Sequence, residues 1–204
     1  MAGSVSEAAP RRLGLFGGSF NPPHLAHLAV AEAAREQADL DRVLWLPAAT
    51  SPFKQGEALP APEHRLAMTR LAVEGNPAFG VSDVEVRRGG VSYTVDTVRA
   101  VQAAHPEAAL FLLLGGDGLA GFRQWRAWEE LLGRVRLLVY RRPGSADPPL
   151  DGALRDRVSF LDAPPLGLSS TYVRGLLRAG RSARYLVPDA VLRYAEAHGL
   201  YATG

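Results

Sequence analysis

Short runs of wholly apolar residues alternate with amphipathic segments along most of the chain. The run Leu110–Leu114 is apolar at every position, which is typical of a strand buried on both faces of a parallel sheet. Strands of this kind that alternate with helices predict an α/β fold with a doubly wound parallel sheet. Strands are expected at Leu13–Phe16, Val43–Leu46, Phe79–Val86, Leu110–Leu114, Arg136–Tyr140 and Val158–Leu161, and helices at Leu25–Gln37, Glu63–Glu74, Thr94–Ala104 and Trp125–Leu132.

The two ends of the chain differ from this alternating middle. Residues 1–12 are rich in Ala and Ser and lack the apolar centre of a signal peptide, so we expect a flexible tail. Residues 13–204 are expected to form a single domain. Within it, residues 142–152 predict a surface loop, and two helical patterns within residues 169–204 predict a small C-terminal helical segment.

The composition excludes several classes of protein. The chain has 204 residues, 47% of them hydrophobic and 22% charged, which is ordinary for a globular domain. Its net charge of +2 and lack of a dense basic run argue against a nucleic-acid partner. No apolar run reaches the roughly 20 residues that span a bilayer, so no membrane partner is expected. Without cysteine, a cytoplasmic location is the simplest expectation, and the oligomeric state stays open, a homo-oligomer included.

Residues 14–27 combine the end of an apolar strand, a glycine turn and the start of a helix. Such a junction directs backbone N–H groups and the positive end of a helix at one point, which favours a bound phosphate. Gly17 and Gly18 allow a close approach of the backbone. His24 and His27 are three residues apart, so their side chains share one face of the helix. The alternative is an ordinary strand-to-helix turn with two surface histidines.

A second helix start near the C-terminus carries hydroxyl groups and an arginine. Ser169 or Ser170 is expected to cap a helix, and Arg174 follows one turn later. This arrangement predicts a second contact with phosphate, although capping serines and a surface arginine are also common without function. Lys54 is the single lysine among 23 basic residues and lies in a proline-rich loop after a strand.

Both segments resemble signatures of the nucleotidyltransferase superfamily. Residues 24–27 resemble its (H/T)xGH signature, with Ala26 in place of the glycine. Residues 168–174 resemble its ISSTxxR signature, which contacts the triphosphate of the nucleotide. Signatures at opposite ends of the chain are more specific together than either is alone. The resemblance implies a Rossmann-like nucleotidyltransferase fold.

Further segments are similar to the bacterial nicotinate-nucleotide adenylyltransferases, and the similarity extends over residues 13–201. The segments that carry this similarity are Arg65–Met68, Ser92–Thr97, Leu114–Asp117, Trp125 and Tyr185–Pro188. Two positions depart from that family: Asn21 replaces an aspartate, and Phe53 replaces a histidine in a Pro-His-Lys loop. The resemblance implies transfer of AMP from ATP to nicotinate mononucleotide, with release of pyrophosphate, in NAD biosynthesis.

The resemblance also implies roles for particular residues. Trp125 would stack on the pyridine ring, although the other interpretation makes it a core partner of Trp128. The catalytic residues would be His24, His27, Arg174 and Lys54. The residues that bind ATP would be Gly17, Gly18, Ser19, Phe20, His27, Ser169, Ser170, Thr171 and Arg174. Those that bind the mononucleotide would be Thr94, Asp117, Trp125 and Arg126.

The chemistry of the reaction fits this set of residues. A mononucleotide phosphate is already ionised at neutral pH, so catalysis requires alignment and charge neutralisation, with no base to activate the attacking group. The expected cofactor is Mg²⁺, held mainly by the phosphates of ATP and by no protein ligand. The alternatives are a related transferase that acts on nicotinamide mononucleotide or phosphopantetheine, a cytidylyltransferase, and a non-catalytic nucleotide-binding module.

Overall fold

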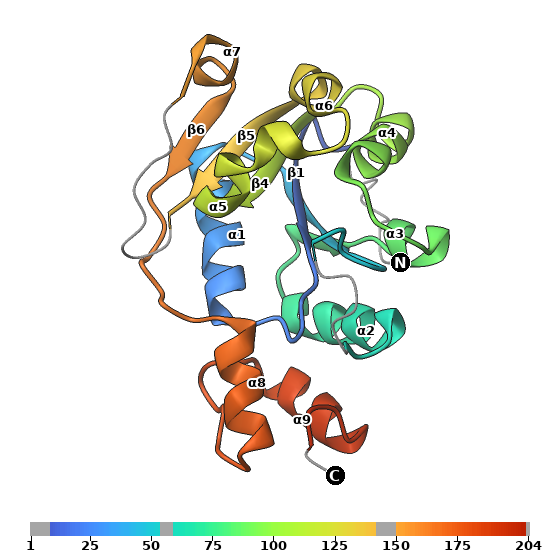
Figure 1. Cartoon of the computed structure of the whole chain (residues 1–204), viewed down its shortest axis with the longest axis vertical. Coiled ribbons are helices and arrows are strands. Elements are labelled where there is room, and N and C mark those ends of the chain that lie inside the picture. Colours follow the sequence, from blue (N-terminus) through green and yellow to red (C-terminus); the bar gives the residue numbers. More distant parts are fainter. Residues whose placement is uncertain (1–8, 54–58, 142–149, 203–204) are drawn as a thin grey trace, which may run out of the picture.

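The fold is built on a six-stranded parallel sheet. The computed structural model describes residues 9–53, 59–141 and 150–202. The strands lie in the order β3-β2-β1-β4-β5-β6, and every neighbouring pair is parallel, which confirms the expected fold class (Figure 1). Their bounds are β1 (Arg12–Gly18), β2 (Arg42–Pro47), β3 (Phe79–Val81), β4 (Ala109–Gly115), β5 (Val135–Tyr140) and β6 (Val158–Leu161).

Helices cover both faces of the sheet. They are α1 (Leu25–Gln37), α2 (Pro62–Val73), α3 (Val84–Arg88), α4 (Thr94–Ala104), α5 (Gly116–Ala120), the 3₁₀ turn η1 (Phe122–Gln124), α6 (Trp128–Arg134), α7 (Gly152–Arg155), α8 (Ser170–Arg178) and α9 (Asp189–Ala197). None of the helices in the described ranges is long and apolar enough to span a membrane.

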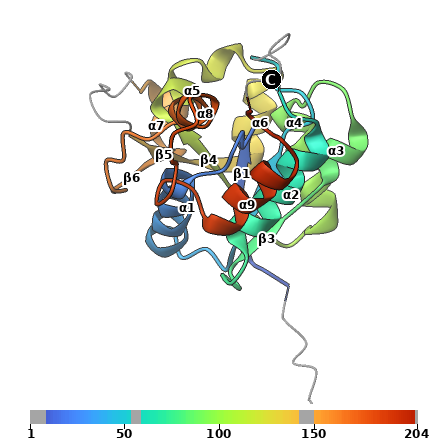
Figure 2. The ribbon, with the colours of Figure 1, turned by 90° about the horizontal axis from the view of Figure 1, so that it is seen from below.

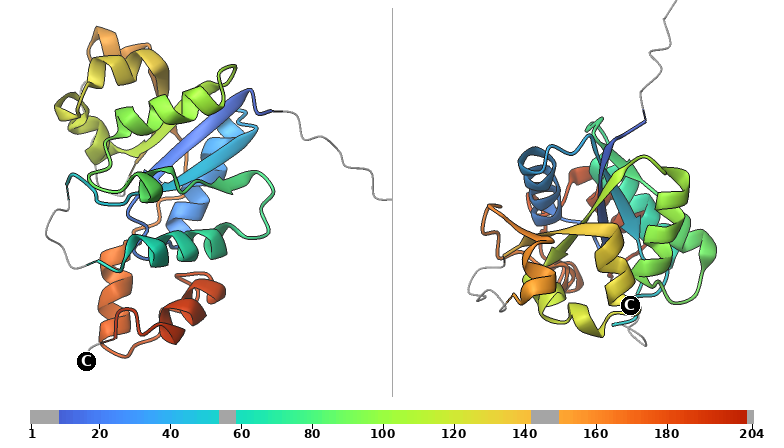
Figure 3. Two further views of the ribbon diagram at one scale, coloured as in Figure 1. Left: turned by 90° about the vertical axis from the view of Figure 1, so that its right-hand side faces the viewer. Right: turned by 90° about the horizontal axis from the view of Figure 1, so that it is seen from above.

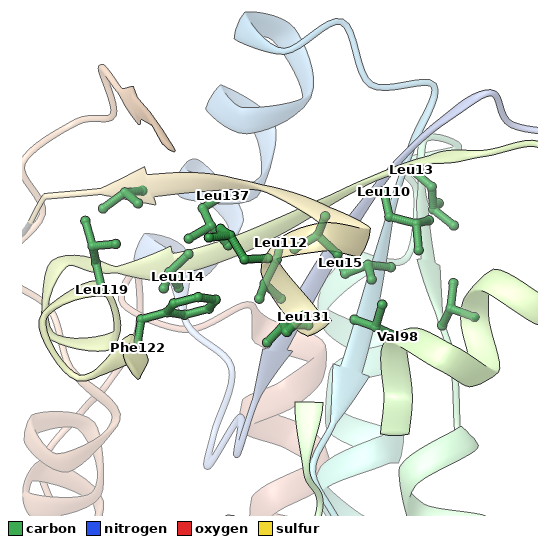
Figure 4. Packing of buried hydrophobic residues seen from close by; sticks show 14 of the residues in the cluster. Leu13, Leu15, Val98, Leu110, Leu112, Leu114, Leu119, Phe122, Leu131 and Leu137 are labelled. Carbon is green, nitrogen blue, oxygen red and sulfur yellow. The ribbon is translucent and has the colours of Figure 1, made fainter. Parts of the chain in front are cut away.

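The apolar run of β4 explains why it is buried on both faces. Leu110, Leu112 and Leu114 pack into one cluster with residues of α4 and α6 (Figure 4). The alternate residues Phe111 and Leu113 pack into a second cluster, which contains residues of α1. Successive side chains of a strand point to opposite faces, so an apolar residue is needed at each position. Each buried Leu contributes about 1.5–3 kcal/mol to folding.

The strand order places a ligand-binding crevice between β1 and β4. The chain runs outward from β1 through β2 to β3, and from β4 through β5 to β6 on the other side. Sheets of this order bind ligands at the carboxyl ends of the strands, where the direction reverses. Gly18 ends β1 and Gly115 ends β4, so the segments that follow them meet at this point.

The C-terminal helices α8 and α9 form a separate layer at one end of the molecule (Figures 1 and 2). Their apolar faces pack against α2 in a third cluster, which includes Met68, Val173 and Val191. As a result α2 lies between the sheet and α9 (Figure 3). Both helical patterns expected in this part of the chain are therefore present.

Some boundaries differ from those expected. The strand expected at residues 79–86 ends at Val81, because the Ser82 hydroxyl accepts a hydrogen bond from the Val84 N–H and the chain enters α3. The helix expected at residues 125–132 begins at Trp128. Ala127 adopts a left-handed conformation (φ 51°, ψ 43°), which separates Trp125 from that helix.

Two further boundaries also differ from those expected. Strand β1 begins at Arg12, and the Arg11 and Arg12 N–H groups donate to Asp41 Oδ2, so the last residues of the expected tail are held by the sheet. The short helix α7 begins at Gly152, the last residue of the expected loop.

Candidate active site

A cavity of about 870 Å³ opens at the carboxyl ends of the strands. Its volume lies within the range of small-molecule sites, roughly 300–1,000 Å³. Most of the residues expected at the site line it: Gly17, Gly18, Ser19, Phe20, His24, His27, Thr94, Asp117, Trp125, Ser169, Ser170 and Thr171. Arg126 and Arg174 are not among the lining residues. Lys54 lies outside the described residues.

The two histidines organise the start of α1. His24 is the N-cap residue, is 4% exposed, and stacks on His27 with ring centroids 3.7 Å apart. The His24 N–H donates to His27 Nδ1 at 3.1 Å. Because Nδ1 accepts this bond, the neutral imidazole of His27 carries its proton on Nε2. The backbone therefore fixes the tautomer in which Nε2 is a hydrogen-bond donor.

Phe20 shapes the turn between β1 and α1. It has a positive φ of 44° and is buried against Phe16 and Trp45, with ring centroids 5.5 and 5.0 Å away. A Cβ at Gly18 would lie 3.1 Å from the Phe20 ring, so a larger residue there would require the ring to move by a few tenths of an ångström. At Gly17 a Cβ would meet no atom within 4 Å. A bulky residue with positive φ is uncommon and occurs mainly at turns and functional sites.

The start of α8 is joined to this turn by hydrogen bonds. Ser169 caps the helix, its Oγ accepting from the Tyr172 N–H at 3.2 Å. The Ser170 hydroxyl donates to the Pro22 carbonyl at 2.9 Å, and Arg174 Nη1 donates to the Asn21 carbonyl at 2.9 Å. We call the turn at residues 17–27 together with these α8 contacts the phosphate corner. It brings the N-termini of α1 and α8, each carrying partial positive charge, to one side of the cavity.

Tyr201 reaches the same corner from the far end of the chain. Its hydroxyl donates to Asn21 Oδ1 at 2.6 Å, and Asn21 is 2% exposed. Burial raises the pKa of the Tyr201 hydroxyl well above its usual value, so the group remains a donor. The sequence does not point to this residue, because nothing in the local pattern connects positions 21 and 201.

The opposite side of the cavity is aromatic and more exposed. Trp125 is half-buried, with the ring of Phe122 at 5.4 Å and that of Phe53 at 6.1 Å between centroids. Phe53 is 70% exposed. Trp128 does not line the cavity and packs against Phe122 instead. We call Phe53, Trp125 and the start of α4 at Thr94 the aromatic rim.

Polar groups border the aromatic rim. Thr94 is the first residue of α4, where the N–H groups of the first turn lack partners within the helix. The Arg126 side chain lies over the Tyr93 ring at 4.7 Å and 3.8 Å from Asp96 Oδ2. Asp117, in the first turn of α5, is the exposed carboxylate on the cavity wall. In the part of the chain that the structure describes, no three His, Asp or Glu side chains gather as a metal site.

The chain is similar in sequence to known proteins over most of its length. Residues 15–176 match a family model described as "Cytidylyltransferase-like". A Salinibacter ruber protein named "Probable nicotinate-nucleotide adenylyltransferase" is 52% identical over 189 residues, which cover 93% of this chain and 97% of that protein. A protein of the same name from Roseiflexus sp. (strain RS-1) is 45% identical, with 93% and 97% covered.

A solved structure extends the likeness to the fold. The Plasmodium falciparum nicotinic acid mononucleotide adenylyltransferase, solved in complex with NaAD, superposes with a TM-score of 0.77, covering 94% of this chain and 97% of that one. The two sequences are 17% identical, so the similarity demonstrates a common fold.

Proposed function

The chain belongs to the nicotinate-nucleotide adenylyltransferase family, and on that premise we propose that it transfers the adenylyl group of ATP to nicotinate mononucleotide. The products are nicotinate adenine dinucleotide and pyrophosphate. The observation that carries the proposal is the pairing of two helix N-termini, those of α1 and α8, on one side of a cavity whose other side is aromatic. One side suits the phosphates of ATP, and the other suits a pyridine ring.

The reaction is a displacement at the α-phosphorus of ATP. An oxygen of the mononucleotide phosphate forms a bond to this phosphorus, and the bond to the oxygen bridging to the β-phosphate breaks. Pyrophosphate leaves with the electron pair. The attacking phosphate is already ionised, so no proton has to be removed from it and the protein needs to align and neutralise charge.

The phosphate corner supplies that neutralisation. His27 donates from Nε2 to the α-phosphate, and His24 holds the His27 ring by stacking and by its backbone N–H. The N-terminal ends of α1 and α8 add partial positive charge on this side of the cavity, with Gly17, Gly18, Ser19, Phe20 and Ser169–Thr171 forming the wall. Arg174, anchored on the Asn21 carbonyl, and Lys54 add positive charge at the triphosphate.

A divalent cation, Mg²⁺, fits the donors present. Mg²⁺ in nucleotide sites uses one or two carboxylates together with substrate phosphates and water, and Asp117 offers one exposed carboxylate at the cavity. When bound, the ion neutralises charge on the phosphate oxygens. Asp117 would hold one of its waters or a ribose hydroxyl.

The aromatic rim would select the mononucleotide. Trp125 stacks on the pyridine ring, and backbone N–H groups near Thr94 and Arg126 bind the nicotinate carboxylate. The amide of nicotinamide would place its own N–H donors against these donors. Sites built for one hydrogen-bonding partner reject the mismatched one by a factor of about 10⁴. We therefore expect kcat/KM for nicotinate mononucleotide to exceed that for nicotinamide mononucleotide by about this factor.

The test is an assay of pyrophosphate release by the full chain with ATP and Mg²⁺. Nicotinate mononucleotide is supplied in one reaction, and nicotinamide mononucleotide, phosphopantetheine or no acceptor in the others, with the dinucleotide product identified by mass. We expect rapid release with nicotinate mononucleotide only. Comparable kcat/KM for both pyridine mononucleotides would contradict the carboxylate site, and activity with phosphopantetheine alone would contradict the proposed function.

A further inference from the structure

A buried arginine in the first turns of α2 bonds to two residues that line the cavity, Ser19 and Ala48. Arg65 is 2% exposed, and its hydrogen bonds to described residues all go to backbone carbonyl oxygens. Nε donates to Pro60 at 3.1 Å, Nη1 to Ser19 at 3.1 Å and to Ala48 at 2.6 Å, and Nη2 to Ala49 at 2.7 Å. A single guanidinium thus holds three separate segments of the chain.

Burying a charged group in this way is costly. Removal from water lowers the pKa of Arg65, yet a guanidinium remains charged at neutral pH. Its neighbours offset this cost with four hydrogen bonds, each stronger than one between neutral groups. The planar fork of arginine suits several carbonyl groups at once, whereas a lysine ammonium is a point charge on a flexible stem. The position is therefore built for arginine in particular.

The segments that Arg65 joins form two sides of the cavity. Ser19 follows the glycines of the phosphate corner, and Ala48 begins the loop that leads to Phe53 on the aromatic rim. This loop is in turn tied to the start of α4: the Ala49 N–H donates to Ser92 Oγ at 3.0 Å, and the Ser92 N–H donates to the Thr50 carbonyl at 2.9 Å. Hydrogen bonds thus run from the phosphate corner through Arg65 to the aromatic rim.

These contacts also orient peptide dipoles. The carbonyl oxygens of Ser19, Ala48 and Ala49 point at the buried guanidinium, so the negative ends of these peptides are not directed at the phosphates. Dipoles that are fixed before the substrate binds need not reorganise during the reaction.

We propose that Arg65 is a positioning residue that sets the spacing between the phosphate corner and the aromatic rim, and so aligns the attacking phosphate with the α-phosphorus. This inference rests on the proposed adenylyl transfer. Arg65 would touch neither substrate and would act through the Ser19 turn and the Ala48–Phe53 loop. A misplacement of reacting groups by about 1 Å lowers a rate by up to about 10²-fold.

The test is the substitution Arg65→Lys in the full chain, with separate kcat and KM values for ATP and nicotinate mononucleotide. We expect kcat to fall by about 10- to 100-fold while each KM changes by less than about threefold, since the binding groups remain. Arg70→Lys makes the same chemical change at an exposed position of α2 and serves as the matched control. Val73→Ala, in a buried position of α2 away from the cavity, controls for loss of stability alone.

A second variant tests the same connection if Arg65→Lys does not fold. Ser92→Ala removes the acceptor of the Ala49 N–H and is expected to lower kcat with little change in the KM for ATP. A kcat within threefold of the wild type in either folded variant would overturn the positioning role, as would a loss confined to KM. A wild-type chain that releases no pyrophosphate would instead overturn the proposed function, and this inference with it.

Discussion

The phosphate corner and the aromatic rim face each other across the cavity but are built differently. In the corner, Asn21 and His24 are 2% and 4% exposed and the turn is held by hydrogen bonds from α8 and Tyr201. At the rim, Phe53 is 70% exposed, and the Arg126 side chain, next to Trp125, is 60% exposed. The corner is thus held by hydrogen bonds within the chain, whereas the rim offers exposed surface that a ligand would cover.

This difference follows from the chemistry on each side. Donors that stabilise a developing charge are effective only when they are fixed beforehand, because reorganising them during the reaction costs free energy. Binding is favoured when a ligand covers an exposed aromatic surface, because removing that surface from water lowers the free energy. We therefore expect changes in the corner to act mainly on kcat or on ATP, and changes at the rim to act on the mononucleotide.

The largest effect is expected for His27→Ala. The variant loses the Nε2 donor that meets charge on the α-phosphate, a contact worth about 3 kcal/mol in the transition state, so kcat should fall by about 100-fold. The KM for nicotinate mononucleotide should change little. Steady-state kinetics check this, with His105→Ala, at the far end of α4, as a histidine control. A fall in kcat of less than about fivefold would remove His27 from the catalytic residues.

Arg174→Ala should come next and act on ATP. Loss of a charge-assisted hydrogen bond to phosphate costs about 1.5–3 kcal/mol, so the KM for ATP should rise at least about tenfold. Arg181→Ala, an exposed arginine just after α8, is the matched control. Lys54→Ala is expected to shift the same KM by a smaller factor. If the dependence of the rate on ATP is unchanged in Arg174→Ala, the role of this arginine is limited to anchoring the Asn21 carbonyl.

Trp125→Ala tests the rim. Losing the stacking surface, worth about 1 kcal/mol, should raise the KM for nicotinate mononucleotide by about fivefold and leave the KM for ATP unchanged. Trp125→Phe retains an aromatic face and should recover most of the affinity. An equal loss of affinity for both substrates would show that the two sides of the cavity are not independent.

The smallest effect is expected for Tyr201→Phe. This change removes only the hydroxyl that donates to Asn21 Oδ1, a bond worth about 1 kcal/mol, so kcat should fall by about threefold. Tyr194→Phe removes a hydroxyl from α9 that contacts His64 and serves as the control with an unchanged kcat. Equal kcat values for both variants and the wild type would mean that the hydrogen bond from Tyr201 to Asn21 does not help to position the phosphate corner.

Periodicity was enough to predict the parallel sheet, while the glycine turn and the capping serines predicted the starts of α1 and α8. The run Leu110–Leu114 has no polar position, so it fits only a strand covered on both faces. In contrast, the start expected for the helix at Trp125 was wrong: α6 begins at Trp128 because Ala127 is left-handed, and alanine carries no local signal for that conformation. The expected strand beyond Val81 ended where Ser82 bonded to the backbone of α3.

The contacts that join distant segments could not be predicted from the sequence. In the sequence, Arg65 stood out only as the first residue of a segment similar to the nicotinate-nucleotide adenylyltransferases. Its four carbonyl partners come from segments up to 46 residues away. Tyr201 lies 180 residues from Asn21. Hydrogen bonds of this kind depend on tertiary packing, and no periodic pattern encodes them.

The central claim is that chemistry resides in the phosphate corner and the choice of mononucleotide in the aromatic rim. The most direct measurement is the ratio of kcat/KM for nicotinate mononucleotide to that for nicotinamide mononucleotide, in the wild type and in His27→Ala. We expect His27→Ala to lower both values by the same factor and to leave the ratio unchanged. A ratio that shifts by more than about tenfold, or 1.4 kcal/mol, would show that His27 also selects the substrate and would contradict the claim.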